Sequence, residues 1–450
     1  MCFCVSVESG EPYACIPIIR RKQRMKIYQK TAVVALLCSV AQLAQSQTNQ
    51  NNQTFSVSEI AAQVVASNPE IEFYKEAITG ANFGKSFAAK LNDPELSFDV
   101  GYKRNKDGRD IENGAVWQVS VMQTFEWPGR ISLRKAIAQK NVELAELGLA
   151  QFKNALSIRA KLLAFGLYSA NEKAAAIAEV AERYKALRET FLQREPSGIS
   201  PIMQTRVIEA AEISLNRSAA DAKLAVENAL IELNLLRGTK INSPVKVRAN
   251  AVDFKELPPL EELLSSAEKF NYDYRTKIVE LEQQGYVVEL SRNERYPSIS
   301  AGPYVSMDKV GGNETIIGLS VSMPLPITGR QTALSNSALS KKRQAQTAVM
   351  LAHRELNRRV ISASKTYETK LADLKRWKAN SIEKFREASE LADRHFRMGA
   401  IDIAVYVEVQ NSYLSAVESL LNTQSEILSA AFELQELTGV DLTPTQRSEK

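Results

Sequence analysis

The sequence predicts a mainly α-helical chain with a transmembrane β part, built by duplication of one unit of long antiparallel helices plus a β-hairpin. Three observations predict this fold class. Two segments alternate apolar and polar side chains with period two, which indicates β-hairpins. A very long stretch with helical periodicity follows each hairpin. Sequence markers of the first half also recur, in the same order, in the second half.

The N-terminal residues 1–46 have the features of a targeting segment. A short basic region at 25–30 precedes an apolar run at 31–40, which is too short to span a bilayer as a mature helix. Small residues at Ala44 and Ser46 stand where a signal peptidase reads the chain. We therefore expect a signal peptide that is cleaved before Gln47.

The residues around this signal lead to two further expectations. The basic residues before Met25 are unusual for a secretory protein, so we interpret Met25 as the true initiator and the preceding residues as an over-called start. All four cysteines lie before the cleavage site, so we expect a mature chain without disulfides. Cys38 follows Leu37, a poor lipoprotein signal, so we do not expect lipidation.

Repeat 1, residues 56–238, follows a flexible polar leader at 47–55. Its hairpin at 94–126 has two strands of about ten residues, a length that crosses a bilayer when the strands are tilted. No proline interrupts the helical pattern from 129 to 194, which predicts a rod of roughly 100 Å. The chain then turns, and a helix at 200–237 runs back along the rod.

Repeat 2, residues 271–439, has the same plan. Five marker residues of repeat 1 recur in order about 200 residues later, which indicates internal duplication rather than chance. The pairs are Asn68 and Asn271, Pro94 and Pro297, Gly129 and Gly329, Gly198 and Gly399, and Gly238 and Gly439. The expected elements are a hairpin at 297–324, a long helix at 330–396 and a helix at 402–438, with an inter-repeat equatorial segment at 239–270 and a tail at 440–450.

The second hairpin favours a membrane location over the alternative of a soluble, half-buried hairpin. One of its faces is apolar, and the other consists of glycine and serine, which suits a crowded or water-filled interior. Four strands cannot close a membrane barrel, since the smallest closures need about eight. Several chains must then share one barrel, and three chains would supply twelve strands.

The sheet meets the helices at Trp127-Pro128-Gly129-Arg130 and again at Gly329-Arg330. Proline and glycine permit the sharp turn that joins a sheet wall to a helix wall. The alternative is that both sites are ordinary helix starts.

The junction segments Gln123–Arg130 and Pro324–Arg330 resemble those of the TolC-type outer-membrane efflux factor family, the first one in particular its heavy-metal (CzcC/CusC-like) branch. The resemblance covers 56–440. It implies a homotrimer with a 12-stranded β-barrel continuous with a periplasmic α-barrel, in the outer membrane of a Gram-negative-type envelope. The implied partners are outer-membrane lipid, a periplasmic adaptor (membrane-fusion) protein and an inner-membrane resistance-nodulation-division (RND) pump.

The resemblance also implies roles for the far ends of the rods, although the turns there are compatible with ordinary helix hairpins. The residues expected to contact the adaptor are Ser197, Gly198, Ser200, Arg397, Gly399 and Asp402. Glu408 occupies the position of a pore-narrowing carboxylate, and its repeat-related position is Arg206, so the two are candidates for a periplasmic gate. The alternative is a pair of solvated helix charges.

The sequence offers no catalytic residues, cofactor site or metal site, and we expect no enzyme activity. The two histidines, His353 and His395, lie beside arginines in helical patterns, and no serine stands in a nucleophile elbow. The net charge of +5 is dispersed, so we expect no nucleic-acid binding. The expected function is a passive efflux duct for heavy-metal cations; the alternatives are drug efflux, type I secretion and a structural coiled-coil protein of the envelope.

Overall fold

The structure is a computed structural model in which contacts divide the chain into two units, Met1–Thr54 and Phe55–Lys450. The fold described below is that of the second unit. The expected signal peptide and the residues Ser197 and Gly198 lie outside the described part of the chain. The described residues are 54–107, 110–192, 199–241, 243–248, 252–310, 312–377, 381–443 and 445–446.

Both hairpins belong to one antiparallel sheet. Its four strands are β2 (Glu95–Asp107), β3 (Asp110–Phe125), β6 (Ile299–Asp308) and β7 (Glu314–Ser322), in the order β2-β3-β6-β7. The central pair, β3 and β6, joins the two halves of the sequence. The first two strands have 13 and 16 residues, so they are longer than the ten or so that the alternating pattern predicts.

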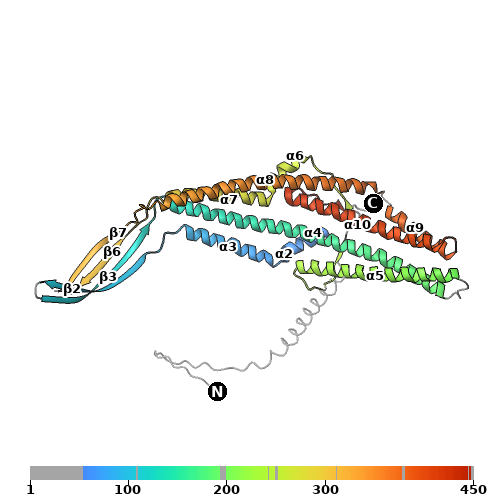
Figure 1. Ribbon diagram of the computed structural model, residues 1–450, viewed down its shortest axis with the longest axis horizontal. Helices are drawn as coiled ribbons and strands as arrows, with labels where there is room; N and C mark the ends of the chain where they lie inside the picture. Colours follow the sequence, from blue (N-terminus) through green and yellow to red (C-terminus); the bar gives the residue numbers. More distant parts are fainter. Residues whose placement is uncertain are drawn as a thin grey trace, which may run out of the picture. The chain divides into compact units, whose positions relative to one another are not determined.

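Repeat 1 wraps three helices along one long helix, α4 (Arg130–Leu192) (Figure 1). The three are α2 (Val57–Ser67), α3 (Glu70–Ala88) and α5 (Ile199–Leu236), and all contact α4. Helix α2 begins with a capping box, in which the Ser56 hydroxyl accepts from the amide of Glu59 and the Glu59 carboxylate accepts from the amide of Ser56. The helix that is predicted at 200–237 to run back along the rod is therefore present as α5.

Repeat 2 differs from the prediction in its long helix. The expected continuous helix at 330–396 is wrong, because α8 (Arg330–Arg376) ends at an extended Trp377 and α9 (Ser381–Arg397) begins anew. No proline or glycine marks this break. The reason is tertiary: α8 buries Leu356, Val360 and Tyr367 in one core cluster, whereas α9 buries Ala392 and Phe396 in another.

The hairpin expected at 297–324 and the helix expected at 402–438 are present. Helix α7 (Tyr272–Asn293) packs on α8, and α10 (Ile403–Thr438) packs on both α8 and α9. The linker contains α6 (Leu260–Phe270) and the strands β4 (Lys246–Arg248) and β5 (Val252–Asp253). Two small sheets pair β1 (Thr54–Ser56) with β4, and β5 with β8 (Thr445–Gln446).

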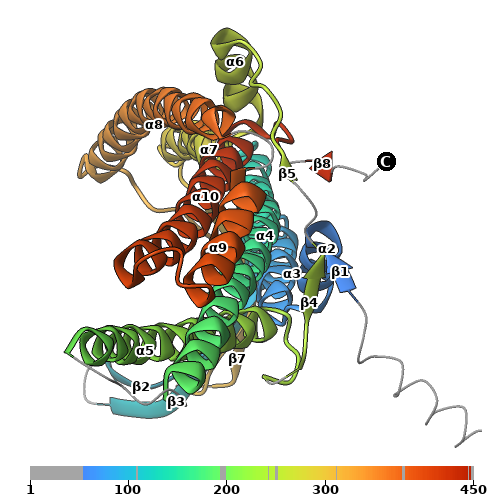
Figure 2. The same ribbon diagram turned by 90° about the vertical axis from the view of Figure 1, so that its right-hand side faces the viewer.

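The apolar core follows the helices. One cluster lies in repeat 1 around α2 and α4, a second in repeat 2 around α6, α8 and α10. A third joins the repeats through α4, α5, α9 and α10, which lie close together when the helices are viewed from their far ends (Figure 2). The fully buried anchors of the three clusters include Leu167, Ile208, Leu263, Tyr367, Tyr406 and Leu434. The long helices are therefore held by side chains far apart in sequence.

Candidate functional site

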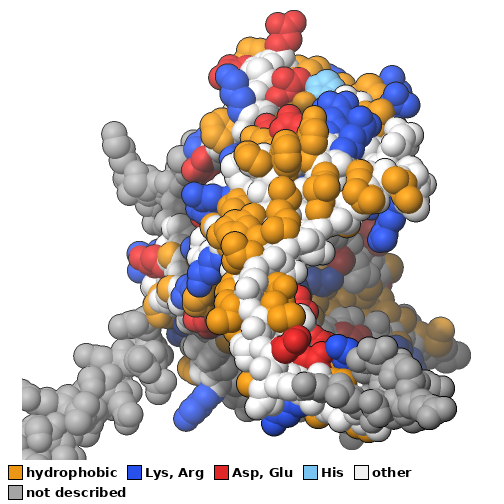
Figure 3. Space-filling view, turned by 90° about the vertical axis from the view of Figure 1, so that its left-hand side faces the viewer, with side chains coloured by type: hydrophobic (Ala, Val, Ile, Leu, Met, Phe, Trp, Pro, Cys, Tyr) orange, Lys and Arg blue, Asp and Glu red, His pale blue; other side chains and the backbone are white. Residues whose placement is uncertain are grey.

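One face of the four-stranded sheet is apolar across all four strands. The pairing registers align one residue of each strand in a row, namely Phe98, Val119, Val305 and Ile317. The outer strands expose their large apolar side chains on this face, from 65% for Phe98 to 80% for Leu319. Figure 3, viewed from the sheet end, shows apolar side chains gathered on the near surface. A continuous apolar surface of this kind requires an apolar surrounding or a partner.

The opposite face of the sheet is small and polar. The same registers place Ser97, Ser120, Tyr304 and Gly318 in one row, and the hydroxyls of Ser97 and Ser120 lie 2.7 Å apart. Near the hairpin loops, Lys103 forms an ion pair with Asp308 at 2.5 Å. The two faces therefore fit two different media, an apolar one and water.

The sheet is tightly joined at its centre and open at its edges. A Cβ atom at Gly302 would lie 1.8 Å from the carbonyl oxygen of Val121, so only glycine fits at this crossing of β3 and β6. The pairing of β3 with β6 has no residue pair at Pro303, so the absence of an N–H group in this proline costs no hydrogen bond there. Within the described residues, β2 and β7 each have a strand neighbour on one side only.

The first junction turns the chain from β3 into α4 through Gly129. Its φ of 88° lies in the left-handed region, which favours glycine. The Trp127 ring stacks on Tyr296, with ring centroids 4.7 Å apart. Glu126 pairs with Arg134 at 2.8 Å across the turn.

Arg130 ties this junction to the connection between α7 and β6. Its guanidinium is buried and donates to the Ser298 hydroxyl and the Tyr296 carbonyl, both at 2.7 Å. It also donates to the side-chain and main-chain oxygens of Asn293, at 3.2 and 3.3 Å. The Asn293 amide in turn donates to the Pro128 carbonyl at 3.0 Å. Each half of the sequence therefore holds the other at the point where sheet becomes helix.

The second junction has the same backbone turn but lacks this network. Gly329 has a φ of 73°, and Arg330 begins α8 as Arg130 begins α4. The Arg330 side chain is exposed and forms no hydrogen bond or ion pair with any described residue. The two junction arginines are therefore equivalent in sequence and different in environment.

The predicted tip residues that the structure describes lie at the α9–α10 turn and at the start of α5. Gly399 has a φ of 73° and closes α9, and the Asp402 carboxylate caps α10 by accepting from the amide of Ile403 at 2.7 Å. Arg397 pairs with Asp393 within α9 at 2.9 Å. Ser200 lies in α5, and its side chain is outside the described part. The adaptor contact of this turn stays a prediction.

The two predicted gate residues are not in contact within one chain. Arg206 pairs with Glu209 on its own helix at 2.7 Å, and its side chain is largely exposed. Glu408 is exposed and forms no ion pair with a described residue. A gate that joins these charges would therefore have to form between chains, and it stays a prediction.

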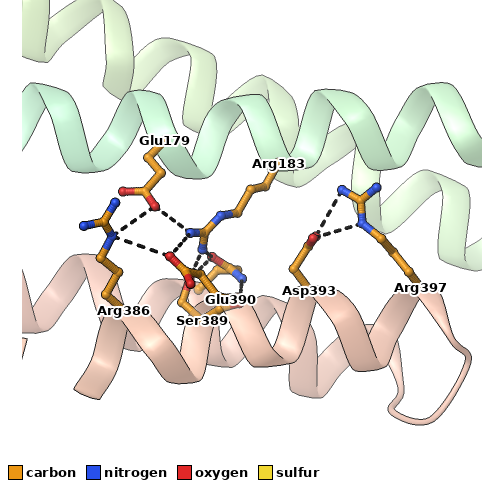
Figure 4. Close-up of polar contacts among 8 residues, drawn as sticks. Glu179, Arg183, Arg386, Ser389, Glu390, Asp393 and Arg397 are labelled. Atoms are coloured by element: carbon orange, nitrogen blue, oxygen red, sulfur yellow. Dashed lines mark hydrogen bonds and ion pairs between the residues drawn. The ribbon is translucent and has the colours of Figure 1, made fainter. Parts of the chain in front are cut away.

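A polar cluster near the tip, which the sequence did not reveal, joins α4 to α9 and α10 (Figure 4). Arg183 donates to Glu179 at 2.6 Å and also to Ser389, which is fully buried. The Ser389 hydroxyl donates to the buried Gln410 side chain at 2.7 Å, and the Gln410 amide donates back to the Ser389 carbonyl at 2.9 Å. Arg386 adds a contact with Glu179 at 3.3 Å. Gln410 is a polar residue among the apolar, buried residues of α10, and this was the one feature of the sequence that could have indicated the cluster.

Two tyrosines, whose rings are tilted against each other, fill the apolar space beside this cluster. The rings of Tyr184 and Tyr406 are 5.3 Å apart, and both are almost fully buried. Burial raises the pKa of Tyr184 to about 12 and raises the pKa of Tyr406 as well. The Tyr406 hydroxyl has no hydrogen-bond partner among the described residues.

The described residues contain no group of three side chains suited to bind a metal ion. His353 pairs with Glu268 at 2.8 Å at the surface. Within the same ranges, no helix combines the length and the apolar character that a membrane-crossing helix needs.

Comparisons with known proteins agree with this geometry. Residues 263–440 match the model of a family described as outer membrane efflux protein. The chain is 24% identical to the cobalt-zinc-cadmium resistance protein CzcC of Cupriavidus metallidurans over 382 residues, which cover 80% of this chain and 87% of CzcC. A membrane protein from Pseudomonas aeruginosa shares the fold, with a TM-score of 0.70, 16% identity and coverage of 85% of this chain and 90% of that one. The Campylobacter jejuni CmeC outer membrane channel gives a TM-score of 0.65 at 17% identity, with coverage of 88% and 87%.

Proposed function

Because this chain belongs to the outer membrane efflux protein family, we propose that it is the outer-membrane channel of an efflux pump. The observation that carries the proposal is the two-faced sheet, which is apolar on one side and small and polar on the other. The apolar side faces outer-membrane lipid and the polar side faces a water-filled lumen. The helices continue this lumen into the periplasm.

Three copies form the channel. Four strands with two open edges cannot close a membrane barrel, which needs about eight strands or more. Three sheets supply twelve strands, and the open edges β2 and β7 then pair between copies. The exposed apolar face has no function in a structural coiled-coil protein of the envelope. We therefore favour the channel over that alternative.

The cargo is heavy-metal cations, and the channel is passive. This part of the proposal rests on the similarity to CzcC, whose name states resistance to cobalt, zinc and cadmium. The partners are a periplasmic adaptor, which meets the turn around Gly399 and Asp402, and an inner-membrane RND pump that supplies the cargo. A duct for drugs or for type I secretion would have the same architecture.

The test combines an assembly assay with a sensitivity assay. Purified protein in detergent should have the mass of a trimer by native mass spectrometry and should conduct ions in planar bilayers. A deletion strain should become sensitive to cobalt, zinc or cadmium and recover with the intact gene. A monomer without conductance would refute the channel, whereas a deletion strain sensitive only to drugs would refute the cargo.

A further inference from the structure

We propose that Arg330 completes its site with a neighbouring copy of this chain, at residues 93–95, where the chain enters β2. The inference rests on the proposed trimer and adds the residues that hold one copy to the next. Its starting point is the contrast between the two junction arginines, since Arg130 has four hydrogen bonds and Arg330 has none with a described residue.

The order of the strands identifies the missing partner. Arg130 follows β3, and it binds the connection that leads into β6, the antiparallel neighbour of β3. Arg330 follows β7, whose second neighbour in a closed barrel is β2 of the next copy. All pairs in the sheet are antiparallel, so this new pair has the orientation of β3 and β6. The connection that leads into β2 therefore stands where the α7–β6 connection stands beside Arg130.

The internal repeat names the contacting atoms. Pro94 and Pro297 are 203 residues apart, and the same spacing relates Asp93 to Tyr296 and Glu95 to Ser298. The Asp93 carbonyl takes the place of the Tyr296 carbonyl, and the Glu95 carboxylate takes the place of the Ser298 hydroxyl. Glu95 is exposed and pairs with no described residue of its own chain. The neutral hydrogen bond of the first junction thus becomes an ion pair between copies.

Helix α3 supplies independent support, because one of its faces is uncovered. Phe73, Phe83 and Phe87 are 72, 71 and 82% exposed on this face. Their repeat equivalents 203 residues later lie on the same face of α7 as Gln283, whose side chain donates to Asn141 of α4 at 2.5 Å. Helix α8 is the repeat equivalent of α4, so α8 of the neighbouring copy covers these aromatic rings. The docking surface therefore continues from the sheet along the helices.

The contact is head-to-tail, since the β7–α8 edge of one copy meets the α3–β2 edge of the next. Such a heterologous contact closes into a ring instead of stopping at a dimer. With three copies, every Arg330 and every Glu95 is used once.

Charge exchange tests the pair in the full-length protein. Arg330→Glu alone and Glu95→Arg alone should each reduce the heat-resistant trimer in detergent by about tenfold or more, because each places two like charges in a desolvated contact. The combined Arg330→Glu and Glu95→Arg variant should recover most of the trimer. Arg394→Glu, which changes an exposed arginine of α9 that pairs with no described residue and lies outside the proposed contact, is the control and should not reduce the trimer.

A second measurement covers variants that fail to fold. Arg330→Cys with Glu95→Cys, treated with a short bis-maleimide, should give a ladder that ends at the trimer. Glu294 lines a surface pocket with Arg330 in the same chain, so Arg330→Cys with Glu294→Cys should cross-link without any ladder. The described residues contain no native cysteine that would compete. A trimeric parent protein without charge rescue or a ladder would overturn this contact alone, whereas a monomeric parent would overturn the proposed channel as well.

Discussion

Replacement of Arg130 by methionine tests whether the first junction is held by hydrogen bonds rather than by the turn itself. Methionine keeps an unbranched apolar stem and removes all the donors and the charge. Two of the lost bonds are short, at 2.7 Å, and end on the Ser298 hydroxyl and the Tyr296 carbonyl. Bonds to a charged donor contribute about 1.5–3 kcal/mol each, and removal of the donor leaves a buried carbonyl unsatisfied.

The two short bonds together give an expected loss of about 3–6 kcal/mol in the free energy of unfolding. The bonds to Asn293 contribute less to this free energy, because they are longer, at 3.2 and 3.3 Å. The loss should be smaller in Arg130→Lys, since an ammonium group keeps the charge but cannot reproduce the planar fork of a guanidinium.

Urea unfolding of the detergent-solubilised protein, followed by circular dichroism, measures this loss. Arg394→Met is the matched control on an exposed helix position, and it should change the free energy by less than about 0.5 kcal/mol. A loss below about 1 kcal/mol in Arg130→Met would show that the junction is held mainly by the Gly129 turn and by the stacking of Trp127 on Tyr296, and the hydrogen-bond reasoning would be refuted.

Four further results are expected. Gly302→Ala should lower the free energy of unfolding by about 1–3 kcal/mol and lower the melting temperature, because the Cβ of alanine would lie 1.8 Å from a backbone oxygen of β3. An unchanged melting temperature would contradict this close approach. Gly129→Val and Gly329→Val should both reduce trimer yield and efflux, since a β-branched residue is strained at positive φ, and normal export by both variants would count against the junction role. Burial raises the pKa of Tyr184 to about 12, so the folded state keeps this hydroxyl protonated, and the stability this contributes should be lost as the pH rises from about 10 towards 12. Tyr184→Phe should remove this loss from a plot of the free energy of unfolding against pH. An unaltered plot would exclude Tyr184 as the cause. Glu408→Ala should conduct better than the parent channel in planar bilayers if this exposed carboxylate narrows the pore, and equal conductance would remove the gate.

Much of the fold follows from local patterns in the chain. Alternation along β2 and β7 identifies the faces of the strands, because successive side chains of a strand point to opposite sides. The five recurring markers identify the repeat. All five positive-φ glycines are marker residues that stand where a turn or a helix end is predicted, namely Gly129, Gly238, Gly329, Gly399 and Gly439.

Other features did not follow from these patterns. No proline or glycine marks the break between α8 and α9. The break arises because the two helices pack into different core clusters. The Arg183–Ser389–Gln410 cluster joins residues more than 200 positions apart, and helical periodicity carries no information about such pairs. Arg206 and Glu408 illustrate the converse, since repeat-related positions on two helices did not bring the charges together in one chain.

The sequence by itself determined the duplicated plan, the two-faced strands and the turns into the long helices, because these depend on residue periodicity and on glycine at positive φ. Only the tertiary structure decided which junction arginine is satisfied within the chain. Arg130 and Arg330 follow the same motif, but among the described strands β3 has a neighbour on both sides and β7 on one. The environment of an arginine depends on which segments surround it in space, so one motif gives a buried anchor in the first repeat and an open contact in the second.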